Sequence, residues 1–123
     1  MGYRSDVTIV IYPDPGEQKS ERYNTLKVLM NTTFKSAYEE WEKSFEWLDH
    51  PRVLQLQMEG IKWYTSYPDV QVITTMLDEI GEMEGYNYEF MRIGEDSDDI
   101  ESNFRGEHLE YYLQLTRSIE VNL

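Results

Sequence analysis

The spacing of apolar residues along this chain changes repeatedly between the period of a strand and the period of a helix. Alternation at every second position marks four segments, residues 3–12, 53–64, 86–93 and 108–121. Steps of three and four mark two further segments, from Glu17 to Leu48 and from Tyr67 to Gly81 or Gly85. The order β-α-β-α-β-β predicts an α+β fold, in which a four-stranded, mostly antiparallel sheet carries two helices on one face. We expect residues 1–123 to form a single domain.

Local signals refine this prediction. The first strand is apolar on both faces, which is typical of a central strand. Asn31, Thr32 and Thr33 are poor helix formers, so we expect them to kink or split the first helix. The apolar phase flips after Gly60, which indicates a bulge or a tight turn. The last two strands are expected to form a hairpin with a long acidic connection, residues 94–106.

The whole chain has a formal net charge of −13, and its acidic residues are concentrated in the second half. Residues 1–64 contain ten acids and eight bases, which gives −2, whereas residues 65–123 contain fourteen acids and three bases, which gives −11. A negative field repels nucleic acid and anionic lipid and attracts basic proteins. We therefore expect a basic, nucleic-acid-binding protein as partner, with no direct contact to nucleic acid or membrane. The alternative, that the acidity only keeps the protein soluble, stays open.

The compartment is indicated by what the sequence omits. There is no cysteine, which excludes disulfides and thiolate metal sites and suits a reducing environment. No stretch approaches the ~20 apolar residues that span a bilayer. These features predict a cytoplasmic protein.

Sequence motifs give no support to catalysis. The chain contains neither a nucleophile elbow nor a glycine-rich phosphate-binding loop. His50 and His108 do not lie at a metal-binding spacing. The acidic connection offers oxygen ligands for a cation, but Ile100 and Glu101 stand where an EF-hand needs a ligand and a glycine. We predict no enzymatic activity, no cofactor and no resident metal.

The candidate contact residues are acids of the second helix and of the acidic connection, together with two tyrosines beside Trp63. Trp63 itself is expected in the core, whereas exposed tyrosines are favoured in protein interfaces. The candidate set is Asp78, Glu79, Glu82, Glu84, Glu95, Asp96, Asp98, Asp99, Glu101, Tyr64 and Tyr67.

Four segments carry a resemblance to a known group of proteins. They are Gly2-Tyr3-Arg4-Ser5-Asp6-Val7, Trp63-Tyr64-Thr65-Ser66-Tyr67-Pro68-Asp69-Val70, Arg92-Ile93-Gly94-Glu95 and Leu115-Thr116-Arg117-Ser118-Ile119. They resemble small uncharacterised acidic proteins of tailed bacteriophages, and the likeness covers most of the chain. Small acidic phage proteins of many folds inhibit host CRISPR effectors, restriction enzymes and polymerases. The resemblance therefore implies an inhibitor in the host cytoplasm and assigns no residue a role.

Three classes of function stay open. The first is an acidic inhibitor that occludes a host nucleic-acid-binding or defence protein, in the manner of an anti-CRISPR protein or a nucleic-acid mimic. The second is an oligomeric protein that binds or sequesters a small ligand; its pocket would be lined by tyrosines and an arginine. The candidates for that pocket are Tyr86, Tyr88, Tyr111, Tyr112, Arg92 and Arg117, and a basic pocket can also include Arg105. The third is a structural or assembly component.

Overall fold

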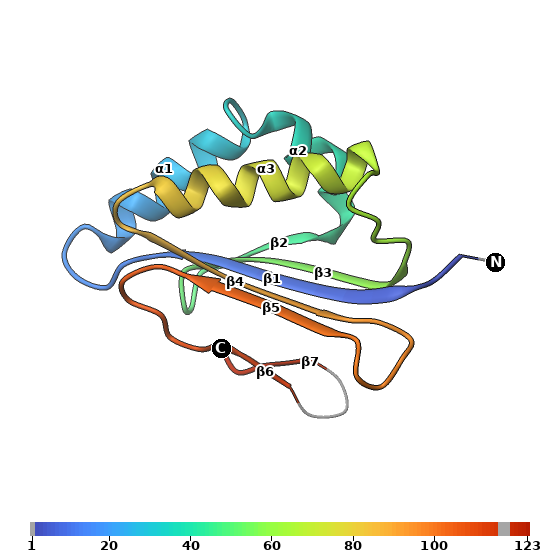
Figure 1. Ribbon diagram of the computed structural model, residues 1–123. Helices are drawn as coiled ribbons and strands as arrows, with labels where there is room; N and C mark the ends of the chain where they lie inside the picture. The colour runs from blue at the N-terminus through green and yellow to red at the C-terminus, as the bar shows by residue number, and fades with distance from the viewer. Residues whose placement is uncertain (1, 116–118) are drawn as a thin grey trace.

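The computed structural model describes residues 2–115 and 119–123, and its centre is a five-stranded antiparallel sheet with strand order β2-β3-β1-β4-β5 (Figure 1). The five strands are β1 (Ser5–Pro13), β2 (Phe45–Leu48), β3 (Val53–Ile61), β4 (Tyr86–Ile93) and β5 (Ile100–Arg105). The helices are α1 (Lys19–Met30), α2 (Lys35–Glu40) and α3 (Pro68–Glu82), with a short 3-10 turn at Glu42–Ser44. A separate two-stranded ladder joins β6 (Leu113–Leu115) and β7 (Ile119–Val121).

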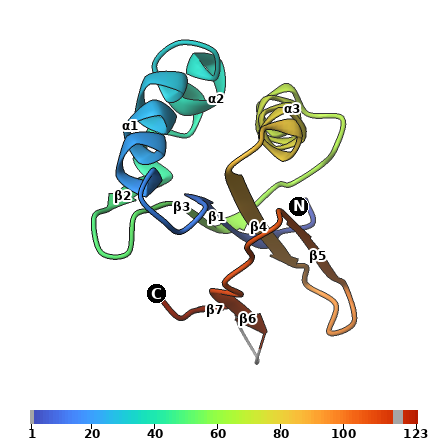
Figure 2. The same ribbon diagram turned by 90° about the vertical axis from the view of Figure 1, so that its left-hand side faces the viewer.

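The main core lies between the sheet and the helices, all of which cover the same face (Figures 1 and 2). Val7, Ile9 and Ile11 of β1 point into it, because alternate residues of a strand share a face. The α3 helix adds a stripe at three- and four-residue steps, and Trp63 is buried beside it. The predicted α+β layering is thereby confirmed, with β1 central as expected; the predicted four strands and two helices are corrected to five strands in the main sheet and three helices.

The helix predicted for residues 17–48 is divided in the structure. It breaks after Met30, at the Asn31-Thr32-Thr33 stretch, and resumes as the short α2. Residues 45–48 are a strand instead of a helical turn, with Phe45 paired to Leu56 and Trp47 to Leu54. Both aromatic side chains face the core, and their spacing of two residues is that of a strand. The sequence pattern did not reveal this, because Phe45 also continues the helical spacing of the preceding apolar residues.

Two predictions about the end of the chain are wrong. The partner of β4 is β5, which begins at Ile100 inside the predicted acidic connection, so that the loop itself is short. The strand predicted for residues 108–121 is replaced by an extended segment and the brief strands β6 and β7. Tyr111 has a φ of 55°, a left-handed conformation that interrupts a strand.

The expected irregularity at Gly60 is confirmed. Ser5 pairs with Ile61 whereas Val7 pairs with Met58, so β3 contains one extra residue between these pairs. Gly60 has a φ of 60°, which glycine adopts without strain.

The second face of the sheet carries a smaller apolar cluster, to which residues 107–113, here called the C-terminal strap, and strand β7 both contribute. Three side chains of the sheet accept hydrogen bonds from its backbone: Asn87 from His108 N (3.0 Å), Tyr12 from Glu110 N (2.8 Å) and Glu89 from Leu113 N (3.0 Å). The strap is thus held by polar side chains that point out of β1 and β4.

Within the described ranges, no helix has both the length and the apolar character required to cross a membrane.

Candidate protein-binding surface

One end of the molecule brings together three segments that are far apart in the sequence. The loop between β4 and β5, the N-terminal segment and the connection from β3 to α3 all lie there (Figure 1). Most of the candidate contact residues fall in these segments. This group, the acidic end, consists of Tyr64, Tyr67, Glu95, Asp96, Asp98, Asp99 and Glu101.

The β4–β5 loop has a defined backbone. Gly94 N donates to Asp99 O (2.8 Å), which closes the loop at its base. Asp99 N donates to Asp96 O (3.0 Å), and Ile100 N donates to Asp98 O (3.1 Å). The acids of the loop are therefore presented from a folded turn.

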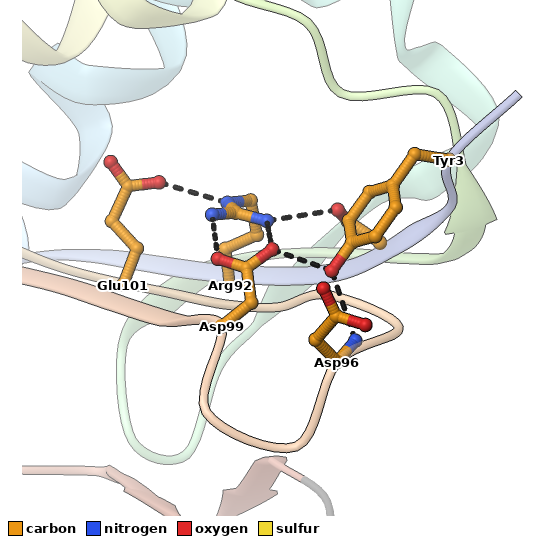
Figure 3. A network of polar contacts seen from close by, with 6 residues as sticks. Tyr3, Arg92, Asp96, Asp99 and Glu101 are labelled. Carbon is orange, nitrogen blue, oxygen red and sulfur yellow. Dashed lines mark hydrogen bonds and ion pairs between the residues drawn. The ribbon is translucent and has the colours of Figure 1, made fainter.

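Arg92, near the end of strand β4, anchors the loop (Figure 3). Its guanidinium forms a bidentate pair with Asp99, at 2.8 and 3.2 Å, and also donates to Glu101 Oε1 (2.9 Å) and Ser5 Oγ (3.1 Å). Two parallel N–H groups of the planar guanidinium match the two carboxylate oxygens, so this contact fixes the orientation of Asp99 relative to Arg92. Only 15% of the Arg92 side chain is exposed.

Tyr3 joins the N-terminal segment to the loop and to the tyrosine pair. Its hydroxyl donates to Asp99 Oδ2 (2.7 Å) and accepts from Asp96 N (3.0 Å), as Figure 3 shows. Its own N–H donates to Tyr64 Oη (2.8 Å). The Tyr64 ring meets the Tyr67 ring edge to face, with centroids 5.0 Å apart. The acidic loop and the exposed tyrosine pair thus belong to one bonded assembly.

These contacts separate two kinds of acid. Asp99 and Glu101 are paired with Arg92, and the hydrogen bonds from Arg92 and then Tyr3 hold the pKa of Asp99 below its ordinary value. Glu95, Asp96 and Asp98 are exposed and, among the residues the structure describes, form no ion pair. Asp99 therefore positions the loop, and the other three carboxylates are free to meet a partner.

The helix acids lie elsewhere. Glu82 pairs with Arg105 at the far end of β5, and Asp78, one turn earlier, occupies the same flank of α3. Glu79 lines a groove of about 400 Å³ between α2 and α3, on the opposite flank. Glu84 lies in the turn from α3 to β4, at the opposite end of the molecule from the loop (Figure 1). The structure therefore divides the predicted contact set and does not join the helix acids to the acidic end.

The tyrosines considered for a ligand pocket also separate. Tyr86 and Tyr88 are buried in the core on the helix side of the sheet, whereas Tyr112 packs on the other side against Tyr12. Tyr111 is exposed there and contacts Phe104. Arg92 is engaged with carboxylates, and Arg117 lies outside the described residues.

Across residues 2–115 and 119–123, no group of three histidine, aspartate or glutamate side chains is placed to hold an ion. His108 lies near Asp14, with Nε2 and Oδ2 separated by 3.8 Å, far from the acidic end.

Tyr3 is the residue of this candidate surface that sequence reasoning missed. No periodicity or motif singles it out, because its role depends on contacts across 96 positions of the chain. Arg92 did carry a signal: it occupies the face of β4 that otherwise holds Tyr86, Tyr88 and Phe90. A charged side chain on an otherwise apolar strand face needs a polar partner, and Asp99 of the loop supplies it.

Comparison of the chain with protein-family models, with curated proteins and with solved structures gives no match to any of them.

The depressed pKa of Asp99 predicts how the acidic end responds to acid. A carboxyl whose pKa is lowered in the folded state adds stability above its unfolded pKa and loses it as the pH falls through the folded pKa. We expect the Asp99 carboxyl carbon to titrate, by NMR, below the ordinary value of 3.8. In Tyr3→Phe, which lacks one of the two groups that lower it, the midpoint should move up towards that value. A wild-type midpoint at or above 3.8 would contradict the arrangement.

Proposed function

We propose that this protein binds a basic, nucleic-acid-binding protein through its acidic end and thereby blocks the access of nucleic acid. The observation that carries the proposal is a set of three carboxylates, Glu95, Asp96 and Asp98, which form no ion pair within residues 2–115 and 119–123 and lie on a loop that Arg92 and Tyr3 fix in place. Duplex DNA carries about one charge per 1.7 Å of axis, and clustered carboxylates offer a basic cleft a similar field.

The fixed loop favours binding in a second way. A loop that is already ordered loses little conformational freedom when it meets its partner, so less of the contact energy is spent on ordering. The loop also has aromatic neighbours, because Tyr67 is 38% exposed and Tyr64 is partly exposed beside it. Tyrosine beside charged residues is typical of protein interfaces.

The charge of the chain narrows the class of partner. At −13 it repels nucleic acid and acidic proteins and accelerates encounter with basic ones. The resemblance to tailed-phage proteins favours a host defence protein, such as a CRISPR effector or a restriction enzyme, as the basic target. In this proposal the protein acts by occlusion and catalyses no reaction.

The test compares two triple variants with the same change in net charge. The first, Glu95→Gln with Asp96→Asn and Asp98→Asn, removes the free carboxylates of the loop. The control, Glu17→Gln with Glu40→Gln and Glu42→Gln, removes three exposed acids from the helix side and from the β1–α1 loop. Tagged proteins are incubated with a bacterial lysate at about 50 mM and about 500 mM salt, and the bound proteins are identified and quantified.

We expect wild type and control to retain a nucleic-acid-binding protein at low salt and to release it at high salt. The loop variant should bind that protein at least about tenfold more weakly, since three charge contacts of about 0.5 kcal/mol sum to roughly one factor of ten. Equal losses in both triple variants would show that overall charge, and not the acidic end, governs binding.

A further inference from the structure

The outer edge of β5 is an unpaired strand edge. In the described part of the chain β4 is its only neighbour, and residues 100–103 are exposed. Figure 2 shows β5 at the outer side of the sheet, with no strand or helix beyond it. Every second residue of such a strand directs its N–H and C=O outwards, which makes the edge a template for another strand.

The side chains of β5 alternate in a way that limits how a second strand can pair. Tyr88 pairs with Arg105, Phe90 with Asn103 and Arg92 with Glu101, so these three β5 residues share the helix side of the sheet. Ser102 and Phe104 face the other side. In an antiparallel pair, residues directly opposite each other lie on the same face. Two copies of β5 can therefore pair symmetrically only about an axis that passes through a residue position.

We propose that β5 pairs with β5 of a second copy about a two-fold axis at Asn103, which joins two five-stranded sheets into one. In this register Glu101 of each copy lies opposite Arg105 of the other, so the symmetry forms the ion pair twice. Such opposite-charge pairs stabilise an antiparallel sheet, whereas like charges in these positions oppose pairing.

Arg105 gives this edge an accessible positive group where two acidic chains would meet. Residues 65–123 hold only three bases, and two of them, Arg92 and Arg105, lie on the helix side of β4 and β5. The Arg105 side chain is 41% exposed and its present partner, Glu82, is 76% exposed, so Arg105 can also meet a second carboxylate. Arg105 can therefore offset part of the repulsion between the two acidic chains, and the symmetry supplies this contact twice.

The inference does not depend on the proposed function, because it needs no other protein. For the proposed function, the dimer has one consequence: the two-fold axis places the two β4–β5 loops, which carry Glu95, Asp96 and Asp98, at opposite ends of the joined sheet. A dimer would therefore present two contact surfaces to an oligomeric or repetitive target.

The absence of cysteine makes a site-specific test possible, since Asn103→Cys carries the only thiol of the chain. Opposite Cα atoms in an antiparallel pair are about 4.5–5.5 Å apart, within the range that a disulfide bridges. Ser102→Cys is the matched control: in the proposed register the two copies of residue 102 lie diagonally, at about 7–8 Å, and cannot be bridged without backbone movement. Mild oxidation should cross-link Asn103→Cys at least about tenfold faster than Ser102→Cys.

Sedimentation gives an independent measurement on the unmodified protein. Wild type at ~100 µM should sediment as a dimer that dissociates on dilution. Glu101→Arg should sediment as a monomer, and the exchange Glu101→Arg with Arg105→Glu should restore the dimer because it restores the opposed charges. A wild-type monomer at this concentration, or cross-linking of Ser102→Cys as fast as Asn103→Cys, would overturn the proposal.

Discussion

Glu89→Ala is expected to destabilise the protein by about 3 kcal/mol and to release the C-terminal strap from the sheet. Glu89 is fully buried, and its two oxygens accept hydrogen bonds from the Tyr12 hydroxyl and from Leu113 N. Alanine leaves both donors without an acceptor in a buried position, and each such loss costs about 1–3 kcal/mol. Chemical denaturation measures the total, and amide hydrogen exchange at Leu113 and Glu110 reports the release of the strap.

Glu89→Gln is the control for this prediction. Its carbonyl oxygen still accepts from Leu113 N, so the strap should stay protected from exchange and the loss of stability should be smaller. An alanine variant as stable as wild type, with unchanged exchange at Leu113, would show that the strap is held by its apolar contacts alone.

Tyr12, which belongs to the same hydrogen-bond network, should make the stability of the strap contacts fall at alkaline pH. Burial first, and then the hydrogen bond to Glu89, raise the pKa of the Tyr12 phenol above its ordinary value. A phenol whose pKa is raised on folding adds stability below its unfolded pKa and loses it as the pH rises through the folded pKa. The strap is therefore expected to stay bound through neutral pH and to weaken in alkali.

Arg92→Met is expected to destabilise the protein by about 2 kcal/mol and to disorder the β4–β5 loop. Methionine keeps much of the side-chain volume but removes the four hydrogen bonds that the guanidinium donates to Asp99, Glu101 and Ser5. The cost is moderated because the released carboxylates are partly exposed and can be hydrated. Denaturation gives the magnitude, and exchange at Gly94 and Asp99 reports the loop.

Two further substitutions sharpen this prediction. Arg105→Met removes an arginine whose ion pair is with the exposed Glu82 and not with the loop, and it should leave the β4–β5 loop protected. Arg92→Lys keeps the charge but loses the bidentate geometry, so its stability should fall between wild type and Arg92→Met. A loop that stays protected in Arg92→Met would contradict the role assigned to this residue.

The strands and helices that the sequence predicts well have one apolar face that packs into the main core. The strand predicted at residues 86–93 is β4, and the proline at position 68 begins α3 as expected. Periodicity is informative in these segments because packing of one face into the main core forces apolar residues to recur at the period of the backbone.

The elements that the sequence misses have no such constraint. Strand β5 is an edge with exposed side chains on both faces, so Glu101, Ser102 and Asn103 show no apolar alternation. Strand β2 is short, and Phe45 happened to continue the helical steps of the preceding segment. The strap alternates apolar and polar residues like a strand, yet it is held by side-chain hydrogen bonds to Tyr12, Glu89 and Asn87.

The candidate surface was also predictable only in part. The acids and tyrosines of the acidic end were expected from composition and local sequence, but their assembly depends on Tyr3 and Arg92, whose contacts are distant in the chain. The sequence could not show that the helix acids lie elsewhere, because it does not specify which end of α3 adjoins the loop.

The central claim, that the acidic end occupies a site otherwise used by nucleic acid, is tested most directly by competition. A basic partner captured at low salt is loaded with labelled duplex nucleic acid, and the protein is added in increasing amount. We expect stoichiometric release of the nucleic acid by wild type and at least about tenfold weaker release by the variant that lacks the loop carboxylates of Glu95, Asp96 and Asp98. A ternary complex in which protein and nucleic acid stay bound together would contradict the claim.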